Sequence, residues 1–517
     1  MSEAMASFDV AIVGYGPVGQ VAAGLLGQRG LKVYVCDRLP GVYEIPRAIA
    51  LDHEIMRVFQ QLGVVDAIAP HTEPFTNSEY FGVDGQLIRR MTMVAPPYPQ
   101  GYTPSLVFTQ PSVERALRAH VGAMPNVQVA LATELRRIAQ DAAGVTLEVE
   151  QGGARRTVRA KYAIACDGGA STVRTQLGMA LEDLDFDEPW LVVDVLVNEQ
   201  GLAKLPATSV QYCEPERPCT LVIGPGNHRR WEIALKPGED PKQVEGDAAT
   251  WKLLARWLTP ADGRLWRQAS YRFHALVAAQ WRQGRVFLAG DAAHMQPPFL
   301  GQGMCQGLRD VANLSWKLGA VLQGQVQGAA AEALLDSYGA ERKAHVRELT
   351  SRIKAVGAVI CERDPVKARQ RDARLLADCG GRVQDTPRQD LLPRLDTGLL
   401  SAHASSARGT LFPQPWLRAG GQPQRMDAVL GNGWRLVLRG PGRPASVPSA
   451  LHVRVLSLAE MPETEGVLAH WFQRHECAAA LVRPDNYVFG VAACVTAAGA
   501  LLDEAAASLG FAAACVA

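Results

Sequence analysis

Apolar runs alternate with helical stretches along the first part of the chain. Residues 8–14 read Phe-Asp-Val-Ala-Ile-Val-Gly, an apolar run that is typical of a buried parallel strand. A helical stretch follows, and a second apolar run at 33–36 then leads directly into the acidic residue Asp37. A strand, a glycine turn, a helix, a strand and an acid in this order predict a dinucleotide-binding unit.

The turn after the first run has the pattern Gly-x-Gly-x-x-Gly. Gly14 permits a tight turn, Gly16 lets a pyrophosphate approach the backbone, and Gly19 lets the helix pack closely on the strand. The phosphates would lie at the helix N-terminus, where free amides and the helix dipole favour negative charge. This pattern alone does not distinguish NAD from FAD. Asp37 would bind the ribose hydroxyls. The other cofactor contacts expected here are Gly14, Gly16, Pro17, Val18, Gly19 and Arg38.

Two later apolar runs end in the same residue types. One run ends at Asp167-Gly168 and is followed by Ser-x-x-Arg, and the other ends at Gly290-Asp291. Both pairs therefore follow predicted buried strands that are far from the first glycine turn in the sequence. We expect three strand ends to contribute to one dinucleotide site.

The remainder of the chain has other patterns. Residues 75–108 and 185–275 contain strand-like runs with many aromatic residues, and residues 127–165 alternate like antiparallel strands. The stretch from about 380 to 425 is rich in Gly, Pro, Arg and Asp, which predicts a linker. Residues 426–517 combine alternating runs with an Ala-rich helix, which predicts a small α/β unit.

Composition narrows the range of partners. The chain has 517 residues, and 53 basic and 52 acidic residues give a net charge of +1. This balance gives no electrostatic reason to expect nucleic acid or an anionic membrane as a partner. The start of the chain lacks a signal sequence and no apolar run is long enough to span a membrane, so we expect a cytoplasmic protein. Ten cysteines without a Cys-x-x-Cys pattern predict neither a disulfide scaffold nor a metal site.

The most specific stretch begins at Pro297-Pro298, continues through Gly301-Gln302-Gly303, and ends at Gly307-Leu308-Arg309-Asp310. Together with the three strand ends, this stretch resembles the flavin-ring loop and following helix of the flavoprotein aromatic hydroxylases. The similarity runs from about residue 8 to about residue 345. Three further stretches are similar to one branch, the 3-(3-hydroxyphenyl)propionate hydroxylases. These are Ile45 to Asp52, Met304-Cys305, and Arg229-Arg230-Trp231-Glu232.

The resemblance implies an α/β fold with three domains. The first is a discontinuous, Rossmann-like FAD-binding domain, and the second is an inserted mixed β-sheet domain that binds substrate. The third is a small C-terminal thioredoxin-like domain. The expected boundaries are 1–74, 109–180 and 281–380 for the first domain, 75–108 and 181–280 for the second, and 400–517 for the third.

The resemblance also implies a reaction. FAD, reduced by transiently bound NADH or NADPH, would use O2 to hydroxylate a phenolic aromatic acid ortho to its hydroxyl through a flavin C4a-hydroperoxide. The expected substrates are 3-(3-hydroxyphenyl)propionate and 3-hydroxycinnamate, and the product would be a catechol. Two alternatives stay open: a hydroxylase of polycyclic or other phenols, and a flavin reductase or binding protein without hydroxylation. The choice between NADH and NADPH and the formation of a homodimer also stay open.

Site residues follow from the same resemblance. The expected flavin contacts are Arg47, Gln110, Asp167, Gly168, Gly290, Asp291, Pro298, Gly301, Gln302, Gly303 and Met304. Pro298 would provide an apolar wall beside the ring, and Arg47 would lie by the flavin or its diphosphate. His53 is the candidate hydrogen-bond partner of the phenol, whereas His294 is expected to be structural. The candidate substrate contacts are Gln211, Tyr212, Arg229, Arg230 and Trp231.

Overall fold

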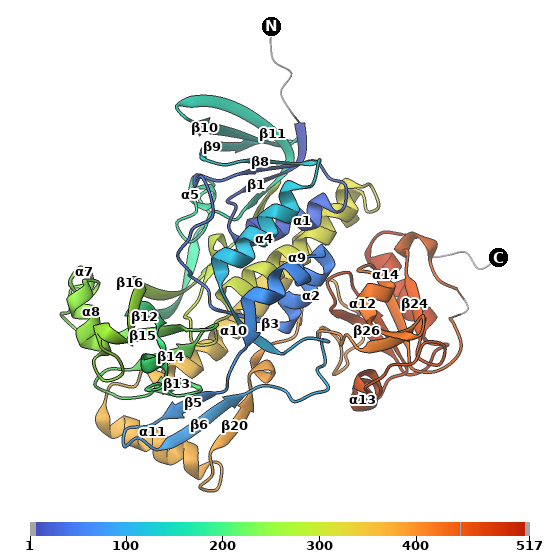
Figure 1. Cartoon of the computed structure of the whole chain (residues 1–517). Helices are drawn as coiled ribbons and strands as arrows, with labels where there is room; N and C mark the ends of the chain where they lie inside the picture. The colour runs from blue at the N-terminus through green and yellow to red at the C-terminus, as the bar shows by residue number, and fades with distance from the viewer. Residues whose placement is uncertain (1–6, 445, 512–517) are drawn as a thin grey trace.

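The computed structural model describes residues 7–444 and 446–511. Figure 1 shows three regions: a sheet covered by helices at the N-terminal end, a second large sheet, and a compact C-terminal region on the other side of the helices. The first two regions are built from segments that alternate along the chain. No helix in the described ranges is long and apolar enough to cross a membrane.

The first sheet brings the three predicted strand ends together. Strand β1 pairs in parallel with both β11 and β2, and β11 pairs in parallel with β18. The carboxyl ends of these strands therefore meet at one edge of the sheet, as expected from the sequence. The strands are β1 (Ser7–Val13), β2 (Val33–Cys36), β8 (Val127–Ala130), β9 (Thr133–Gln140), β10 (Val145–Gln151), β11 (Ala154–Ala165), β17 (Arg282–Gln283) and β18 (Val286–Leu288).

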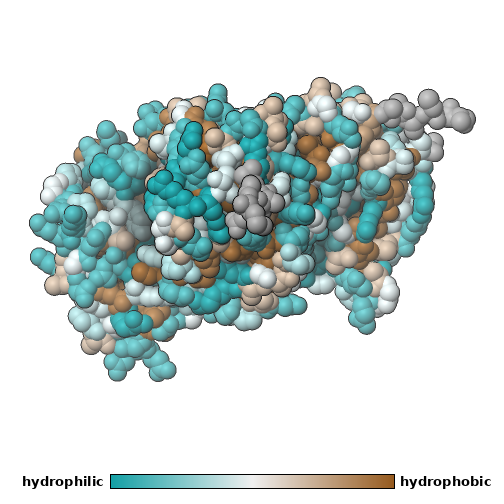
Figure 2. Space-filling model, turned by 90° about the horizontal axis from the view of Figure 1, so that it is seen from above, coloured by the Kyte–Doolittle hydropathy of each residue, from teal (hydrophilic) through white to brown (hydrophobic). Residues whose placement is uncertain are grey.

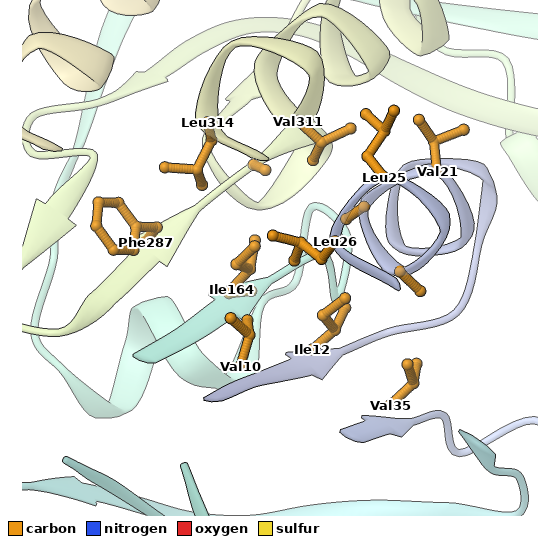
Figure 3. Packing of buried hydrophobic residues seen from close by; sticks show 14 of the residues in the cluster. Val10, Ile12, Val21, Leu25, Leu26, Val35, Ile164, Phe287, Val311 and Leu314 are labelled. Carbon is orange, nitrogen blue, oxygen red and sulfur yellow. The ribbon is translucent and has the colours of Figure 1, made fainter. Parts of the chain in front are cut away.

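Helices pack on this sheet because its strands are apolar on both faces. In Figure 3, Leu25 and Leu26 of one helix and Val311 and Leu314 of another lie over the same side of the sheet as Ile12. All five side chains are at most 2 % exposed. The helices of this region are α1 (Pro17–Gly27), α2 (His53–Leu62), α3 (Val65–Ile68), α4 (Gln110–Gly122), α5 (Thr172–Gln176), α9 (Gly303–Leu322) and α10 (Gly328–Ile360). A small three-stranded sheet joins it to the second sheet and consists of β3 (Ala50–Asp52), β4 (Thr72–Pro74) and β7 (Ser105–Phe108).

The second sheet has nine strands in the order β19-β16-β12-β15-β14-β13-β5-β6-β20. One face packs on α8 through an apolar cluster that includes Trp231 and Leu254. The other face is turned toward the first region. The strands are β5 (Ser78–Phe81), β6 (Leu87–Thr92), β12 (Leu181–Val197), β13 (Ser209–Tyr212), β14 (Cys219–Ile223), β15 (His228–Ala234), β16 (Gly263–Ala278), β19 (His294–Met295) and β20 (Gln384–Pro387). The helices are α6 (Glu199–Leu202), α7 (Pro241–Val244), α8 (Asp247–Leu254) and α11 (Pro365–Ala377).

The prediction of a linker from about 380 to 425 is wrong. Strand β20 pairs in parallel with β6 and completes the edge of the second sheet, and a 3-10 helix (Arg388–Leu391) follows it directly. A hairpin of β21 (Trp416–Ala419) and β22 (Gln422–Arg425) closes the stretch. Four-residue strands rich in polar residues have no clear alternation, so composition alone indicated a loop.

The C-terminal region has a four-stranded sheet in the order β24-β23-β25-β26. The pair β23/β24 is parallel and the other two pairs are antiparallel, which is the arrangement expected for a thioredoxin-like unit. Buried ion pairs tie it to the first region, including Arg57 to Asp427 at 2.8 Å and Arg483 to Glu341 at 2.7 Å. Its elements are α12 (Met426–Leu430), β23 (Arg435–Leu438), β24 (Arg454–Ser457), α13 (Val467–Arg474), β25 (Ala479–Val482), β26 (Val488–Ala492) and α14 (Ala498–Ser508). The face of the molecule seen in Figure 2 is mainly hydrophilic, with smaller hydrophobic areas between the polar residues.

Candidate active site

A cavity of about 460 Å³ lies between the first sheet and the second sheet. Its lining includes the glycine turn after β1, the end of β18 and the loop before α9. On the opposite side, the lining comes from β12, β13, β14, β15 and β16. The cavity thus joins the predicted nucleotide-binding turns to the predicted substrate sheet.

The three glycines of the first turn have different surroundings. Gly14 has a φ of +98°, and a Cβ there would lie 2.3 Å from the carbonyl oxygen of Cys166. A Cβ at Gly19 would lie 2.0 Å from the carbonyl oxygen of Gly14. At Gly16, in contrast, φ is −75° and a Cβ would meet no heavy atom within 4 Å. Gly14 and Gly19 are therefore required by the packing of the protein, whereas Gly16 leaves open space in the cavity wall.

The acid after β2 supports the turn. Asp37 accepts hydrogen bonds from the backbone N–H of Tyr15 at 2.6 Å and from that of Leu39 at 2.7 Å. Arg38 is exposed. Neither side chain lines the cavity, which is bordered here by Gly16, Pro17 and Val18. Contacts of Asp37 and Arg38 with a cofactor stay predictions.

The end of β18 is held by a buried charge network. Asp310 accepts hydrogen bonds from the backbone N–H of Gly290 at 2.9 Å and from Arg342 at 2.9 Å, and it pairs with His294 at 2.8 Å. Burial alone would raise the pKa of Asp310, but His294 and Arg342 hold it below its usual value. His294 thus has a structural contact, and it also lines the cavity. Next to this network, the exposed side chain of Asp291 lines the cavity.

The side chain of Asp167 does not face the cavity. Its neighbours Cys166 and Gly168 line the cavity, but the Asp167 side chain does not. Its Oδ2 accepts a hydrogen bond from the backbone N–H of Val173 at 3.1 Å, at the start of α5. One carboxylate oxygen therefore satisfies a helix N-terminus, whereas Oδ1 is buried without a hydrogen-bond partner among the described residues, and the cofactor contact of Asp167 stays a prediction.

Several residues predicted to contact the flavin lie in the loop before α9 and line the cavity. Pro298, Gly301, Gly303 and Met304 line the cavity, and a Cβ at Gly303 would meet no heavy atom within 4 Å. Helix α9 begins at Gly303, so its free N–H groups lie at the cavity wall. Gln302 does not line the cavity, because its Oε1 accepts a hydrogen bond from Arg309 at 2.8 Å.

Gln110 holds a second loop against the cavity. Its Oε1 accepts hydrogen bonds from the backbone N–H groups of Arg47 at 2.8 Å and Ala48 at 2.6 Å, and its Nε2 donates to Glu114 at 2.8 Å. Both Gln110 and Arg47 line the cavity. The Arg47 side chain is exposed and lies over the ring of Tyr43, 5.6 Å from its centroid.

The predicted substrate contacts are only partly brought to the cavity. Gln211 and Arg230 line it, but Tyr212, Arg229 and Trp231 do not. Trp231 is 0 % exposed in the apolar cluster on the other face of the sheet. The last three assignments are wrong because side chains alternate between the faces of a strand, so a shift by one residue reverses the face.

Arg230 is already neutralised by the protein. It donates to Asp194 through Nε at 2.7 Å and through Nη2 at 3.1 Å, and it also donates to the carbonyl oxygen of Arg47 at 2.8 Å. The pKa of Asp194 is about 2; burial alone would raise it, but Arg230 and His228 outweigh the burial. This pair therefore orients the Arg47 loop rather than offering a free cation.

Glu232, two residues further along β15, has no such partner. Its side chain lines the cavity and the residue is 7 % exposed. Within residues 7–444 and 446–511, the carboxylate forms no hydrogen bond and no ion pair, and Arg230 and Arg267 act on it only through their charges. Burial raises its pKa, despite the opposing effect of Arg230. A buried carboxylate that faces a cavity without a partner is a strong acceptor for a donor on a ligand.

His53 is not brought to the cavity. It is 4 % exposed at the start of α2, and burial lowers its pKa to about 4. The expectation that it contacts a phenol is wrong, since the ring is enclosed in the protein. Sequence reasoning also missed Glu232 and Arg388 as cavity-lining residues. Glu232 could have been found from its alternation with Arg230 along one strand, whereas nothing local distinguishes Arg388.

Comparisons with known proteins agree with this geometry. The family described as "FAD binding domain" matches residues 7–353, and the "HcaD C-terminal domain" matches residues 409–507. The chain is 36% identical to a "Probable NADH-specific resorcinol 4-hydroxylase" of Rhodococcus jostii, covering 94% of this chain and 92% of the relative. It is 32% identical to a "3-(3-hydroxy-phenyl)propionate/3-hydroxycinnamic acid hydroxylase" of Mycobacterium sp. (strain JLS), covering 94% and 89%.

Solved structures show the same fold. The flavin-dependent monooxygenase PieE, in complex with FAD and substrate, has a TM-score of 0.81 at 23% identity, covering 98% of this chain and 100% of that one. Aklavinone-11 hydroxylase, in a ternary complex with FAD and aklavinone, has a TM-score of 0.80 at 24% identity, covering 97% and 99%. The similarity thus extends over all three regions of the chain.

Proposed function

The chain belongs to the family of FAD-dependent aromatic hydroxylases, and we propose that it hydroxylates a monocyclic phenol at the carbon next to the phenolic hydroxyl. The electron donor would be NADH or NADPH, and the oxygen would come from O2. One observation supports this most directly: the loops suited to FAD and the unpaired Glu232 carboxylate line the same cavity.

The residues at the cavity wall fit FAD. Gly16 and Gly303 each leave open space where a side chain would project, and the N-termini of α1 and α9 begin beside them. Such N-termini stabilise negative charge on phosphates or on a reduced flavin ring. Bound FAD would supply the electron transfer and carry the oxygen, while the protein supplies position and polarity. Pro298 would exclude water from that part of the site.

Glu232 is the residue that we assign to the phenol. An aromatic ring donates electrons more readily when its hydroxyl proton is shared with a base. The carboxylate lies on β15 between Thr220 of β14 and Val192 of β12, and all three side chains line the cavity. A phenol bound on this sheet would meet Glu232 with its hydroxyl and the loop before α9 with its ring face.

Two relatives and the sequence motifs favour phenols with a second substituent in the meta position. The names of the relatives include resorcinol and 3-(3-hydroxyphenyl)propionate, and both compounds have this pattern. We therefore propose 3-(3-hydroxyphenyl)propionate, 3-hydroxycinnamate and resorcinol as the first substrates to test. Polycyclic phenols are the second candidate class, because structures of the same fold bind them.

A substrate panel tests this proposal. At least one of the three compounds should accelerate NADH or NADPH oxidation by about tenfold or more, since enzymes of this kind need a gate against wasteful oxidation. Product analysis should show an ortho-diol in proportion to the nicotinamide consumed. Stimulation by polycyclic phenols alone would overturn the substrate class and leave the family unchanged. Nicotinamide oxidation that yields only hydrogen peroxide with every phenol would favour the reductase alternative.

Asp167→Ala tests the role of the turn after β11. The change removes the acceptor for the Val173 N–H at the start of α5, so the turn should loosen by about 1 kcal/mol. We expect a decrease in FAD affinity of about fivefold, measured by fluorescence titration of the apoprotein, with flavin reduction slowed to a similar degree. Unchanged affinity and reduction would mean that the turn is held by its backbone alone.

A further inference from the structure

Arg388 is a buried cation at the wall of the cavity. It follows β20 directly, is 8 % exposed, and lines the cavity. Its Nη2 donates to the carbonyl oxygen of Leu300 at 2.5 Å, in the loop before α9. Its guanidinium lies over the ring of Phe75, 4.5 Å from the centroid. These two contacts fix the side chain in place and direct it at the cavity.

No carboxylate neutralises this guanidinium. Among the described residues, no acidic side chain forms an ion pair with Arg388, and Asp52 acts on it only through its charge. Three other buried arginines near the cavity differ in this respect. Arg230 pairs with Asp194, Arg309 with Asp52 and Glu54, and Arg342 with Asp310. Burial lowers the pKa of Arg388, but an arginine stays charged at neutral pH.

A buried charge without a counter-ion is costly, and an anionic ligand would remove that cost. The other arginines that line the cavity do not have this property. Arg267 is buried, but the carboxylate of Asp194 lies 3.6 Å from its guanidinium. Arg272 is exposed and pairs with Asp187 at 2.8 Å, and Arg47 is exposed to solvent. Exposed guanidinium groups are well solvated and gain little from an anion. Arg388 is thus the cavity-lining arginine best suited to hold a carboxylate.

We propose that Arg388 binds a carboxylate on the substrate, at the opposite end of the substrate from the hydroxyl that Glu232 accepts. This inference rests on the proposed function and deepens it, since it selects a phenol with an acidic side chain. A guanidinium binds a carboxylate through two parallel hydrogen bonds, which gives both affinity and orientation. Arg388 would therefore determine specificity for acidic over neutral phenols.

The second sheet separates Glu232 from Arg388, so one substrate could contact both with opposite ends. Glu232 is on β15, and Phe75, on which Arg388 lies, is three residues before β5. Three strand spacings separate β15 from β5 in the sheet order, which is roughly 14 Å between the backbones. Between them, the cavity wall carries Thr220 and Gln211, whose side chains are hydrogen-bonded to each other at 2.5 Å. A ring with a short acidic chain suits this span better than a ring with two hydroxyls.

The test compares acid and amide forms of one compound. In Arg388→Met, the KM for 3-(3-hydroxyphenyl)propionate should increase by about 30- to 100-fold, as expected for loss of a charge-assisted pair. The KM for the neutral 3-(3-hydroxyphenyl)propanamide should change less than about threefold, because the methionine keeps the apolar contact with Phe75. Arg388→Lys should recover part of the loss. Arg394→Met is the matched control, because it removes an exposed guanidinium that pairs with Asp396 and does not line the cavity, and it should change neither KM.

The melting temperature and FAD content of each variant show whether it is folded. Calorimetry on the oxidised, FAD-bound protein measures ligand binding without turnover. Here 3-phenylpropionate should bind at least about tenfold more weakly to Arg388→Met than to the wild type. Equal losses for acid and amide would overturn the proposal and point to packing or to the reduced flavin. So would equal binding of 3-phenylpropionate by both proteins. If the wild type hydroxylates no phenol and yet binds 3-phenylpropionate through Arg388, the proposed function fails and the anion site stands.

Discussion

Gly16→Val should produce a folded protein that retains almost no FAD. The backbone at Gly16 has a φ of −75°, which suits any residue, and a Cβ there meets no protein atom within 4 Å. The valine side chain would therefore project into the cavity and occupy the space of the cofactor. We expect FAD affinity to decrease by at least about 1,000-fold, because the backbone can no longer approach the pyrophosphate.

Flavin absorbance after gel filtration measures the FAD that remains, and circular dichroism shows that the fold is kept. Gly122→Val is the control: this glycine is exposed at the end of α4, and a Cβ there also meets no atom within 4 Å. It should keep full FAD occupancy. Full occupancy in Gly16→Val would show that the cofactor does not lie against this turn. Gly14→Val is less informative, since the clash with Cys166 strains the protein itself.

Glu232→Gln should separate nicotinamide oxidation from hydroxylation. The amide keeps the size of the side chain but cannot accept the phenol proton, so product formation should decrease by about 100-fold. Flavin reduction in the presence of substrate should change little, and the consumed oxygen should appear as hydrogen peroxide. Single-turnover experiments that measure reduction and product separately test this. Equal loss of both rates would mean that Glu232 acts in binding instead.

The pH dependence offers a second test of the same residue. Burial raises the pKa of Glu232, and the carboxylate form exists only above that pKa. Hydroxylation should therefore decrease as the pH falls, and the midpoint should lie above the usual pKa of glutamate. This acid limb of kcat/KM should be absent in Glu232→Gln.

Asp194→Asn should also destabilise the position of the Arg230 side chain at the cavity wall, because it leaves this buried guanidinium without its counter-ion.

The nucleotide side of the cavity could be predicted because its signals are local. Gly14 and Gly19 are required where strand and helix meet, and the glycine turns follow apolar strands that can be identified from the sequence. The strand-like runs at 75–108 and 185–275 likewise indicated the second sheet. The sequence did not show which alternate residues of β15 face the cavity, so Trp231 was assigned to the cavity and Glu232 was not.

Other parts of the site depend on tertiary structure. Arg388 reaches the cavity because β20 pairs with β6, almost 300 residues earlier in the chain, and no local pattern encodes that pairing. His53 follows a motif segment, but α2 turns its ring into the protein interior. Asp167 lies in a recognisable motif, and only its hydrogen bond with the N–H of Val173 shows which way the carboxylate points.

The central claim is that this protein transfers one oxygen atom from O2 to a phenol. The most direct measurement uses the purified FAD-bound protein, NADH or NADPH, 18O2, and either 3-(3-hydroxyphenyl)propionate or resorcinol. Mass spectrometry of the product should show one 18O atom, ortho to the original hydroxyl, for each nicotinamide oxidised. An unlabelled phenol recovered in full, with all 18O in hydrogen peroxide for both compounds and for a polycyclic phenol, would contradict the account.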